Sequence, residues 1–260
     1  MPKLALVTGA TKGIGRALTE KLLHSGLIVF GTGRDEYCLR EIEKQFSNFT
    51  GIPADLTCNA DIRRIAEMIR QTNLPLNYLV QNAGMKAPPT CLENYTCEGI
   101  DEVMQVNLLA PMKLTALLTT HLVEYSRVVY VTSRAATLKL EESSTYCASK
   151  AGLDETAAIV RKELREKNIG VVSVIPGEVD TNIQKTLRQT KTFHLHQIFQ
   201  QAYDRGQLIK PEICADFLKW VLCDMPFESF STVDMPLSIY DSGHHKYWLH
   251  QPEQLPAFPF

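Results

Sequence analysis

The chain has little excess charge of either sign and no long apolar run. Its 260 residues carry 27 Lys and Arg against 29 Asp and Glu, a formal charge of −2, so it has no basic surplus for a nucleic-acid surface. Nowhere do 18 apolar residues stand together, and the N-terminal apolar run of four residues is too short for the core of a signal peptide. We therefore expect a soluble, cytoplasmic protein that binds neither nucleic acid nor membrane.

Linkers, repeats and paired cysteines are also missing. No Pro/Ser-rich stretch divides the chain, and its length suffices for one large α/β domain, so we expect a single domain over 1–260. The seven cysteines are odd in number and include no C-x-x-C pair, which favours reduced thiols over disulfides or a zinc site. His194 and His196 have no third ligand near them, so we expect no metal.

Short apolar runs alternate with longer amphipathic stretches through most of the chain. The runs are typical of strands buried on both faces, and they cover 4–8, 27–32, 51–55, 78–82, 127–133 and 170–176. Helices are expected between them over 13–25, 35–47, 58–72, 99–124 and 145–167, with Asp35 as an N-cap and Gly26 as a C-cap. This alternation predicts an α/β Rossmann fold, a doubly wound parallel sheet of about seven strands with helices on both faces.

The pattern changes after Pro176. Residues 178–209 are polar, with apolar residues at roughly helical spacing, so we expect helices packed over the site as a substrate lid. Residues 249–260 contain three prolines. We expect them to form an extended tail or a subunit contact, with a frayed end as the equal alternative.

The segment TGATKGIG (8–15) joins the first expected strand to the first expected helix. Gly9, Gly13 and Gly15 permit a tight turn and let the backbone approach a pyrophosphate at the helix N-terminus. Their Gly-x-x-x-Gly-x-Gly spacing differs from the common dinucleotide fingerprint, and a plain turn is the alternative. The strand before the segment and the helix after it favour nucleotide binding.

The residues after the second expected strand indicate which dinucleotide binds. An acid there binds the ribose 2′-hydroxyl of NAD, whereas an arginine accommodates the 2′-phosphate of NADP. The sequence reads GTGRDE, with Arg34 after Gly33, and Lys12 supplies a second cation. We expect NADP(H) rather than NAD(H), with Asp35 as a helix cap. In the alternative, Arg34 and Lys12 are solvated surface residues and Asp35 binds the ribose 2′-hydroxyl instead.

A tyrosine and a lysine stand four residues apart in SSTYCASKAG (143–152). On a helix Tyr146 and Lys150 share one face, but a Tyr-x-x-x-Lys match is frequent by chance and needs support from other motifs. Ser133 closes the fifth expected strand, and Asn107 is a polar residue among apolar ones in an expected helix. With the turn QNAG (81–84), these features converge where the fold places its ligand.

Together the motifs resemble the classical short-chain dehydrogenase/reductase family over essentially residues 3–181. The glycine motif, QNAG, Asn107, Ser133, the Tyr146 and Lys150 pair and PGEVDT (176–181) fall in the family's order and at family-like spacing. Gln81 replaces a family asparagine and Thr132 a frequent serine. Neither change removes a group that the family's mechanism requires.

The resemblance implies NADP(H)-dependent reduction of a carbonyl to an alcohol by hydride transfer. Tyr146 would be the proton donor, Ser133 would orient and polarise the carbonyl, and Asn107 would hold a water in a proton relay. Lys150 would bind the nicotinamide ribose and lower the pKa of Tyr146. A cation about 4 Å away can supply the roughly 4 kcal/mol needed to bring a phenol pKa from about 10 to 7, but desolvation opposes it, so the cofactor's positive charge must help.

The resemblance also implies a set of cofactor-binding residues along the strand ends. These are Gly9, Thr11, Lys12, Gly13, Ile14, Gly15, Arg34, Asp55, Leu56, Asn82, Ala83, Gly84, Tyr146, Lys150, Pro176, Gly177, Val179 and Thr181. Within this set, Asp55 would touch the adenine and Thr181 the carboxamide.

The downstream sequence is similar to the sepiapterin and benzil reductase branch of the family. PGEVDT and the later GQLIKPE (206–212) carry this likeness. Sepiapterin reductases hold the pterin with an acid two residues before a C-terminal Tyr-Asp, and that place is Ser238 here, so a pterin reductase is only an alternative. We expect a ketone, diketone or aldehyde substrate, with aromatic or dicarbonyl compounds preferred. Its pocket would be shaped by Met85, Phe193, His194, Leu195 and Phe199.

A non-catalytic NADP(H)-binding regulator on the same fold is the alternative from another functional class, because a fold does not fix a function. The intact Ser-Tyr-Lys set argues against it. The helices expected over 99–124 and 145–167 are long enough to pair across a two-fold axis, as family members commonly do. We therefore expect a homodimer or homotetramer.

Overall fold

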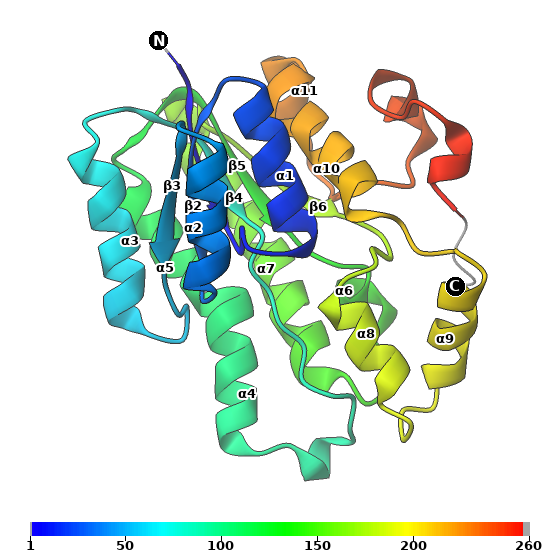
Figure 1. The fold of residues 1–260 in the computed structure, drawn as a ribbon. Coiled ribbons are helices and arrows are strands. Elements are labelled where there is room, and N and C mark those ends of the chain that lie inside the picture. The colour runs from blue at the N-terminus through cyan, green and yellow to red at the C-terminus, as the bar shows by residue number, and fades with distance from the viewer. Residues whose placement is uncertain (1, 257–260) are drawn as a thin grey trace.

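A computed structural model describes residues 2–256, apart from the side chain of Pro252. At its centre is a sheet of seven parallel strands in the order β3-β2-β1-β4-β5-β6-β7, with helices on both faces (Figure 1). The strands are β1 (Leu4–Thr8), β2 (Ile28–Gly33), β3 (Phe49–Pro53), β4 (Leu76–Gln81), β5 (Leu122–Val131), β6 (Gly170–Ile175) and β7 (Leu237–Ser238). The predicted doubly wound parallel sheet is confirmed.

Alternate residues of each strand pack into separate cores on the two faces of the sheet. In β1, Ala5 and Val7 face one core and Leu4 and Leu6 the other, and all four are fully buried. One core lies under α1 (Gly13–His24), α2 (Glu36–Gln45) and α10 (Pro211–Lys219), the other under α3 (Asn59–Gln71), α5 (Ala110–Leu118) and α7 (Ser144–Leu164). Because both faces are covered, these strands are continuous apolar runs in the sequence.

The order in which the strands are added to the sheet reverses between β1 and β4, although all strands are parallel. The chain builds outward from β1 to β3 on one side and from β4 to β7 on the other. In open α/β sheets this reversal opens a crevice at the carboxyl ends of the two central strands. The glycine turn leaves β1 at this point and QNAG leaves β4 there, so the fold places both motifs beside the same crevice.

Several element boundaries differ from the prediction; for example, β5 starts at Leu122 instead of residue 127 and ends at Val131, so that Ser133 lies just beyond it. The single helix expected over 99–124 is divided into α4 (Cys97–Met104), a π-helical turn (Gln105–Leu109) and α5, and its predicted end was wrong because Leu122 pairs with Leu76 in the sheet. The strand expected over 51–55 starts earlier, because Phe49 pairs with Val29. Asp55 therefore lies beyond the end of β3.

The segment 178–209, expected as a lid, contains α8 (Asn182–Gln189) and α9 (His196–Asp204). Leu187, Phe193, Phe199, Ala202 and Leu208 form a small apolar cluster of their own, separate from the two sheet cores. The segment thus has an apolar cluster of its own, while Val179 and Ile209 near its ends pack in the core under α1, α2 and α10. Its role as a lid stays a prediction.

Short elements complete the described chain. They are α6 (Ala135–Leu138), α11 (Phe227–Ser231), a second π-helical turn (Trp220–Asp224) and 3₁₀ turns at Leu92–Asn94, Arg165–Lys167, Ser242–Tyr247 and Pro252–Gln254. Of the tail expected over 249–260, residues 257–260 lie outside the described residues. Between residues 2 and 256, every helix is too short or too polar to cross a bilayer.

Candidate active site

The turn between β1 and α1 requires its glycines. Gly9 and Gly13 have φ angles of +71° and +55°, a region that other residues rarely adopt. A Cβ atom on Gly15 would lie 2.2 Å from the Gly9 carbonyl oxygen. The N-cap of α1, Lys12, makes no side-chain cap bond, so the first N–H groups of the helix are left for an anion at this positive end of the helix dipole.

Hydrogen bonds join the exit of β4 to this turn. Asn82 Nδ2 donates to the carbonyl oxygen of Thr8 at 2.8 Å, and Thr8 Oγ1 accepts from the backbone N–H groups of Asn82 and Ala83, both at 3.0 Å. Gly84 follows, and a Cβ atom there would lie 3.4 Å from Lys150 Nζ. The structure thus fixes the glycine turn and QNAG to each other, and it places Gly84 and Lys150 on the lining of one cavity.

At the end of β2, Asp35 caps α2, which confirms the predicted cap. Its Oδ1 accepts from the Cys38 backbone N–H at 2.9 Å and its Oδ2 from Cys38 Sγ at 3.1 Å. These bonds lower the pKa of Asp35, and Lys12 adds a smaller effect in the same direction. Arg34 and Lys12 are both exposed. This corner therefore presents two cations, while the adjacent carboxylate is occupied by the cap.

The residues after β3 are tied down locally. Asp55 Oδ1 accepts from the Thr57 backbone N–H at 2.9 Å and from Thr57 Oγ1 at 2.8 Å. The Leu56 side chain is buried in the core under α3, and its carbonyl oxygen accepts from Gln105 Nε2 at 3.2 Å. A cofactor could meet Leu56 only at its backbone.

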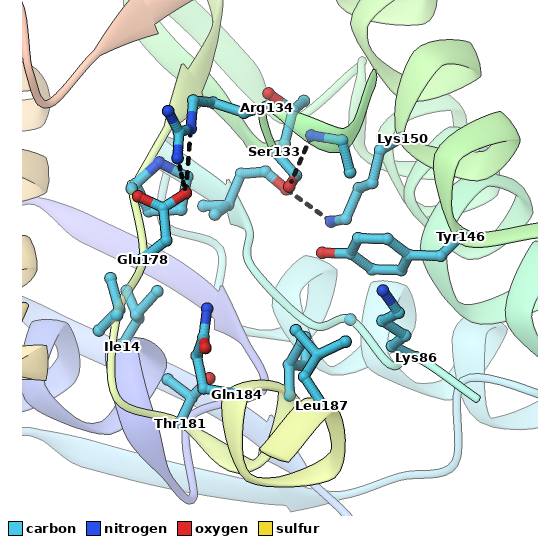
Figure 2. Close-up of a pocket in the computed structure, with 18 of the residues that line it drawn as sticks. Ile14, Lys86, Ser133, Arg134, Tyr146, Lys150, Glu178, Thr181, Gln184 and Leu187 are labelled. Atoms are coloured by element: carbon cyan, nitrogen blue, oxygen red, sulfur yellow. Dashed lines mark hydrogen bonds and ion pairs between the residues drawn. The ribbon is translucent and has the colours of Figure 1, made fainter. Parts of the chain in front are cut away.

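One cavity collects the remaining predicted residues, from the ends of β5 and β6, the start of α7 and the start of α8 (Figure 2). The predicted residues that line it are Ile14, Asn82, Gly84, Ser133, Tyr146, Lys150, Pro176, Gly177, Val179 and Thr181. The others follow the ends of β1 to β4 outside this lining: Gly9, Thr11, Lys12, Gly13, Gly15, Arg34, Asp55, Leu56 and Ala83. Asn107 lies behind Gly84, since a Cβ atom on Gly84 would be 3.5 Å from its Oδ1.

Ser133, Tyr146 and Lys150 lie together in this cavity. Tyr146 and Lys150 extend from the same face of α7, and both are buried, with 8% and 3% of their surface exposed. Lys150 Nζ donates to the carbonyl oxygen of Val131 at 2.8 Å, and the Ser133 hydroxyl hydrogen bonds with Tyr146. Figure 2 shows the Tyr146 hydroxyl pointing into the cavity near the amine of Lys150.

Burial dominates the protonation of this pair. Burial raises the pKa of Tyr146 to about 12, although its hydrogen bond with Ser133 acts in the opposite direction. Burial also lowers the pKa of Lys150 to about 8, with partial compensation by Asp154. The Lys150 amine is held by Val131, 6.0 Å from the centre of the Tyr146 ring, and burial is the larger effect on the Tyr146 pKa. The lowering of this pKa by Lys150 together with a bound cofactor stays a prediction.

Asn107 is fully buried in the π-helical turn, a kind of helix defect that is frequent at functional sites. Its Oδ1 accepts from the Met85 backbone N–H at 2.8 Å, and its Nδ2 donates to the Met85 carbonyl oxygen at 2.8 Å and to Ser149 Oγ at 3.0 Å. Both side-chain donors are thus used to hold the segment after QNAG against α7. The water relay at Asn107 stays a prediction.

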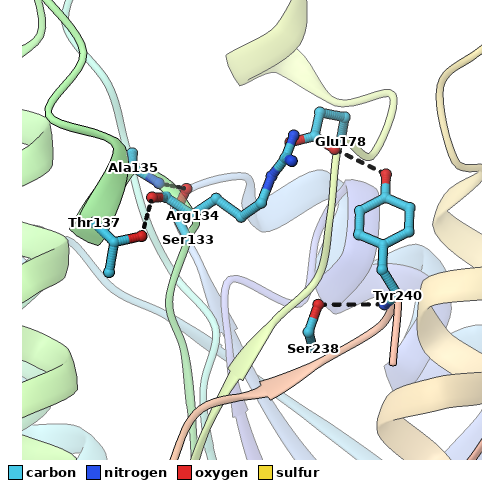
Figure 3. Close-up of polar contacts among 7 residues, drawn as sticks. All are labelled: Ser133, Arg134, Ala135, Thr137, Glu178, Ser238 and Tyr240. Atoms are coloured by element: carbon cyan, nitrogen blue, oxygen red, sulfur yellow. Dashed lines mark hydrogen bonds and ion pairs between the residues drawn. The ribbon is translucent and has the colours of Figure 1, made fainter. Parts of the chain in front are cut away.

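Sequence reasoning missed a polar group at the mouth of β6. Glu178 forms an ion pair with Arg134, and the Tyr240 hydroxyl donates to Glu178 Oε2 at 2.8 Å (Figure 3). Arg134 and Glu178 line the cavity. Their positions directly after Ser133 and within PGEVDT were a usable signal, but Tyr240 comes from a segment distant in sequence.

Lys86 was missed as well, and it lines the same cavity two residues after QNAG. Among the residues expected to shape the substrate pocket, Phe199 lines the cavity, whereas Met85, Phe193, His194 and Leu195 are not part of its lining. Phe193 is fully buried in the apolar cluster that residues 178–209 form by themselves. His194 instead contacts Glu142, with its Nδ1 2.8 Å from Glu142 Oε2.

The geometry so far defines a dinucleotide-type α/β fold with a serine, a tyrosine and a lysine at its crevice. The sequence profile of the short chain dehydrogenase family matches residues 3–192. The chain therefore belongs to the short chain dehydrogenase family. This confirms the family prediction that was made from the motifs.

Individual relatives agree with this assignment. A benzil reductase ((S)-benzoin forming) from Bacillus cereus is 29% identical over 85% of this chain and 94% of its own length, in keeping with the predicted likeness to that branch. A short chain dehydrogenase/reductase from Saccharomyces cerevisiae superposes with a TM-score of 0.86 at 21% identity, covering 95% of this chain and 99% of its own. A short chain dehydrogenase from Burkholderia cenocepacia, solved in complex with NADP, gives a TM-score of 0.77 at 27% identity, with 91% of this chain and 96% of its own covered.

Membership of this family makes the chain an oxidoreductase of small molecules that uses a nicotinamide cofactor. The described site suits such a cofactor. The helix N-terminus at the glycine turn has no side-chain cap, and Gly84 and Lys150 line the same cavity.

Proposed function

We propose that the protein is an NADP(H)-dependent reductase that converts a carbonyl group to an alcohol. The observation that carries the proposal is the meeting of Ser133, Tyr146 and Lys150 in one cavity that also reaches Asn82 and Thr181, at the reversal point of the sheet. A regulator that only bound the dinucleotide would need neither the proton donor Tyr146 nor the Ser133 hydroxyl beside the cofactor. Reduction of a carbonyl needs both a proton donor and a group that holds the carbonyl oxygen.

In this proposal Tyr146 supplies the proton. Its raised pKa keeps the phenol protonated at neutral pH, so a proton is available for the carbonyl oxygen as the carbonyl carbon is reduced. The Ser133 hydroxyl holds and polarises the same oxygen. Lys150 stabilises the phenolate that remains and would hold the ribose of the cofactor. The nicotinamide, when bound, supplies the hydride from its C4 atom.

The preference for NADP(H) is part of the proposal. Arg34 and Lys12 lie exposed at the end of β2, and both carboxylate oxygens of Asp35 are occupied by Cys38. A 2′-phosphate would find two cations there, and the carboxylate beside them already caps α2. The relative from Burkholderia cenocepacia, solved with NADP, supports this choice.

For the substrate, we propose an aromatic or dicarbonyl compound. Apolar side chains of Leu138, Ile183, Leu187 and Phe199 line the cavity, which suits an apolar body. The benzil reductase relative supports a substrate of this kind. A pterin is disfavoured, because Ser238 replaces the expected acid and bonds with its hydroxyl to the Tyr240 backbone N–H at 3.3 Å, outside the cavity lining.

The test of this function is the change Tyr146→Phe. It removes the proton donor while keeping the ring, so oxidation of NADPH with an aromatic diketone should fall by about 10²–10⁴-fold. The measurement is NADPH absorbance over time, with NADPH affinity followed separately by fluorescence and expected to stay within about threefold of wild type. Tyr125→Phe, at an exposed tyrosine at the opposite end of the sheet, is the matched control.

Two results would contradict the function. Full activity of Tyr146→Phe would show that another group donates the proton. Tight NADPH binding by the wild type without oxidation by any compound in a panel of ketones, diketones and aldehydes would favour the non-catalytic regulator.

A further inference from the structure

Lys86 lies in the cavity without an ionic partner. It follows QNAG, and its side chain is only partly accessible. Its Nζ lies 5.1 Å from the centre of the Tyr146 ring and 5.8 Å from that of Phe193. Within residues 2–256, Lys86 Nζ has no hydrogen bond and no ion pair; its neighbours are the faces of these two rings and, as a weak influence on its pKa, Cys147.

The other charged groups of the cavity are already satisfied. The carboxylate of Glu178 is paired with Arg134 and accepts a hydrogen bond from the Tyr240 hydroxyl. The Lys150 amine donates to the carbonyl oxygen of Val131. Lys86 is therefore the cation in the described lining that has neither an acid nor a carbonyl oxygen to hold it. Figure 2 shows it on the other side of the Tyr146 ring from Lys150.

A charge in this position costs free energy in the protein alone. Burial lowers the pKa of Lys86 to about 8, and contacts with aromatic faces offset only part of such a cost. A methionine or leucine would fill similar space without the penalty. A half-buried charge in a cavity that pairs with no acid among the described residues is suited to a ligand of opposite charge.

We propose that Lys86 is a substrate-positioning residue that pairs with a carboxylate on the carbonyl compound, so that the substrate class is oxo acids with an apolar body. The inference rests on the proposed reductase function and names its substrate class. The carboxylate of the substrate would bind at Lys86. The apolar body of the substrate would lie against Leu187 and Phe199, and its carbonyl group would lie at Ser133 and Tyr146.

The reaction balances without a further reagent. Hydride passes from NADPH to the carbonyl carbon and the proton passes from Tyr146 to the carbonyl oxygen, which gives a hydroxy acid and NADP⁺. The Tyr146 phenolate then takes a proton from water, so that one proton from solvent is consumed in each turnover. The carboxylate is unchanged throughout. Lys86 keeps its proton and acts only by position and charge.

The test compares phenylglyoxylate with its methyl ester, which has the same carbonyl and ring but no charge. For the wild type we expect a kcat/KM about 30-fold higher for the acid, which corresponds to about 2 kcal/mol. Lys86→Met should remove this preference mainly through KM of the acid, with a loss for the acid about ten times that for the ester. Lys86→Arg should restore part of it. Lys185→Met, at an exposed lysine of α8 outside the lining, should change neither substrate.

Calorimetric titration of phenylglyoxylate into wild type and Lys86→Met, each with saturating NADP⁺, separates this inference from the function. Binding that depends on Lys86 without any reduction would support the carboxylate site and defeat the reductase. Reduction of the ester with no preference for the acid, or equal losses for both compounds in Lys86→Met, would overturn the inference and leave the reductase standing.

Discussion

Three titratable side chains around one cavity, two of them buried and Lys86 half-buried, show how position sets chemistry at the scale of the residue. Burial disfavours the charged form of all three, because it raises the pKa of Tyr146 to about 12 and lowers the pKa of Lys150 and Lys86 to about 8, and both lysines stay mostly protonated at neutral pH. The tyrosine thus holds a proton that it can give. Each lysine carries a charge that an anion would stabilise: the phenolate for Lys150, and a substrate carboxylate for Lys86.

The choice between cofactors depends on another single residue, Arg34. Arg34→Ala removes one of the two cations at the end of β2, so the Kd for NADPH should rise by about 10–100-fold while that for NADH changes by less than about threefold. Fluorescence titration with both dinucleotides measures this. Arg40→Ala provides the control, since Arg40 is exposed on α2 and paired with Glu36. Equal losses for NADPH and NADH would refute the phosphate contact.

How far residues can be predicted from sequence depends on what positions them. Tyr146 and Lys150 are visible because helical spacing alone places them on one face. The cap at Asp35 is visible for the same local reason. Tyr240 is not, because its bond to Glu178 joins residues 62 positions apart, which only the packed sheet brings together.

At the scale of the element, the glycine turn shows the strictest demand for one residue type. Gly15 has no room for a side chain, since even a Cβ atom would lie 2.2 Å from a backbone oxygen and 2.4 Å from Asn82 Nδ2. Backbone atoms cannot yield as a side-chain end can. The turn, the exit of β4 and the start of α1 therefore share one tightly packed junction.

Gly15→Ala should break this junction. We expect a loss of about 2–4 kcal/mol in the free energy of unfolding and a loss of NADPH affinity, because the turn must shift to admit the methyl group. Urea unfolding and dinucleotide titration measure the two effects. Gly26→Ala is the comparison: Gly26 has a φ of +83° but open space around it, so only backbone strain of about 1 kcal/mol is expected, with cofactor binding retained. A Gly15→Ala protein with wild-type stability would contradict this account.

Elements were predicted well where local pattern decides, and less well where pairing decides. β1 matches its expected bounds because its apolar run is bounded by the glycine turn. The end of the expected 99–124 helix was wrong because apolar residues suit a helix and a strand equally, and only the pairing of Leu122 with Leu76 favours the strand. The π-helical turn at Asn107 has no periodic signal and depends on the bonds of Asn107 to Met85.

At the scale of the whole molecule, the sheet order explains why residues from the first and last thirds of the chain meet. The reversal between β1 and β4 brings the glycine turn, QNAG and the start of α7 to one edge, and β7 brings Tyr240 to Glu178. Strand and helix alternation predicted this topology from sequence because right-handed crossovers leave few other choices. The seventh strand, only two residues long, has too little pattern to be located in advance.

The exterior of the molecule leaves apolar side chains uncovered on the helices that were expected to pair. Leu109 and Met112 near the start of α5 are 39% and 43% exposed, and Ile159 on α7 is 47% exposed. We propose that these helices form the contact of a homodimer, which can assemble further into a tetramer. Such a contact would cover the three side chains around a two-fold axis.

The double change Met112→Glu and Ile159→Glu, which adds charges of one sign, tests this contact. Around a two-fold axis each substituted position would face its own copy or a near neighbour, and the newly buried charges would make association unfavourable. Light scattering after size exclusion should then give a mass of 29.3 kDa for the variant and about twice that or more for the wild type. Tyr37→Glu, at a tyrosine 71% exposed on α2, should leave the assembly intact. A wild-type protein with the mass of one chain would show that this contact does not form. A double variant that still assembles would show that the contact lies elsewhere.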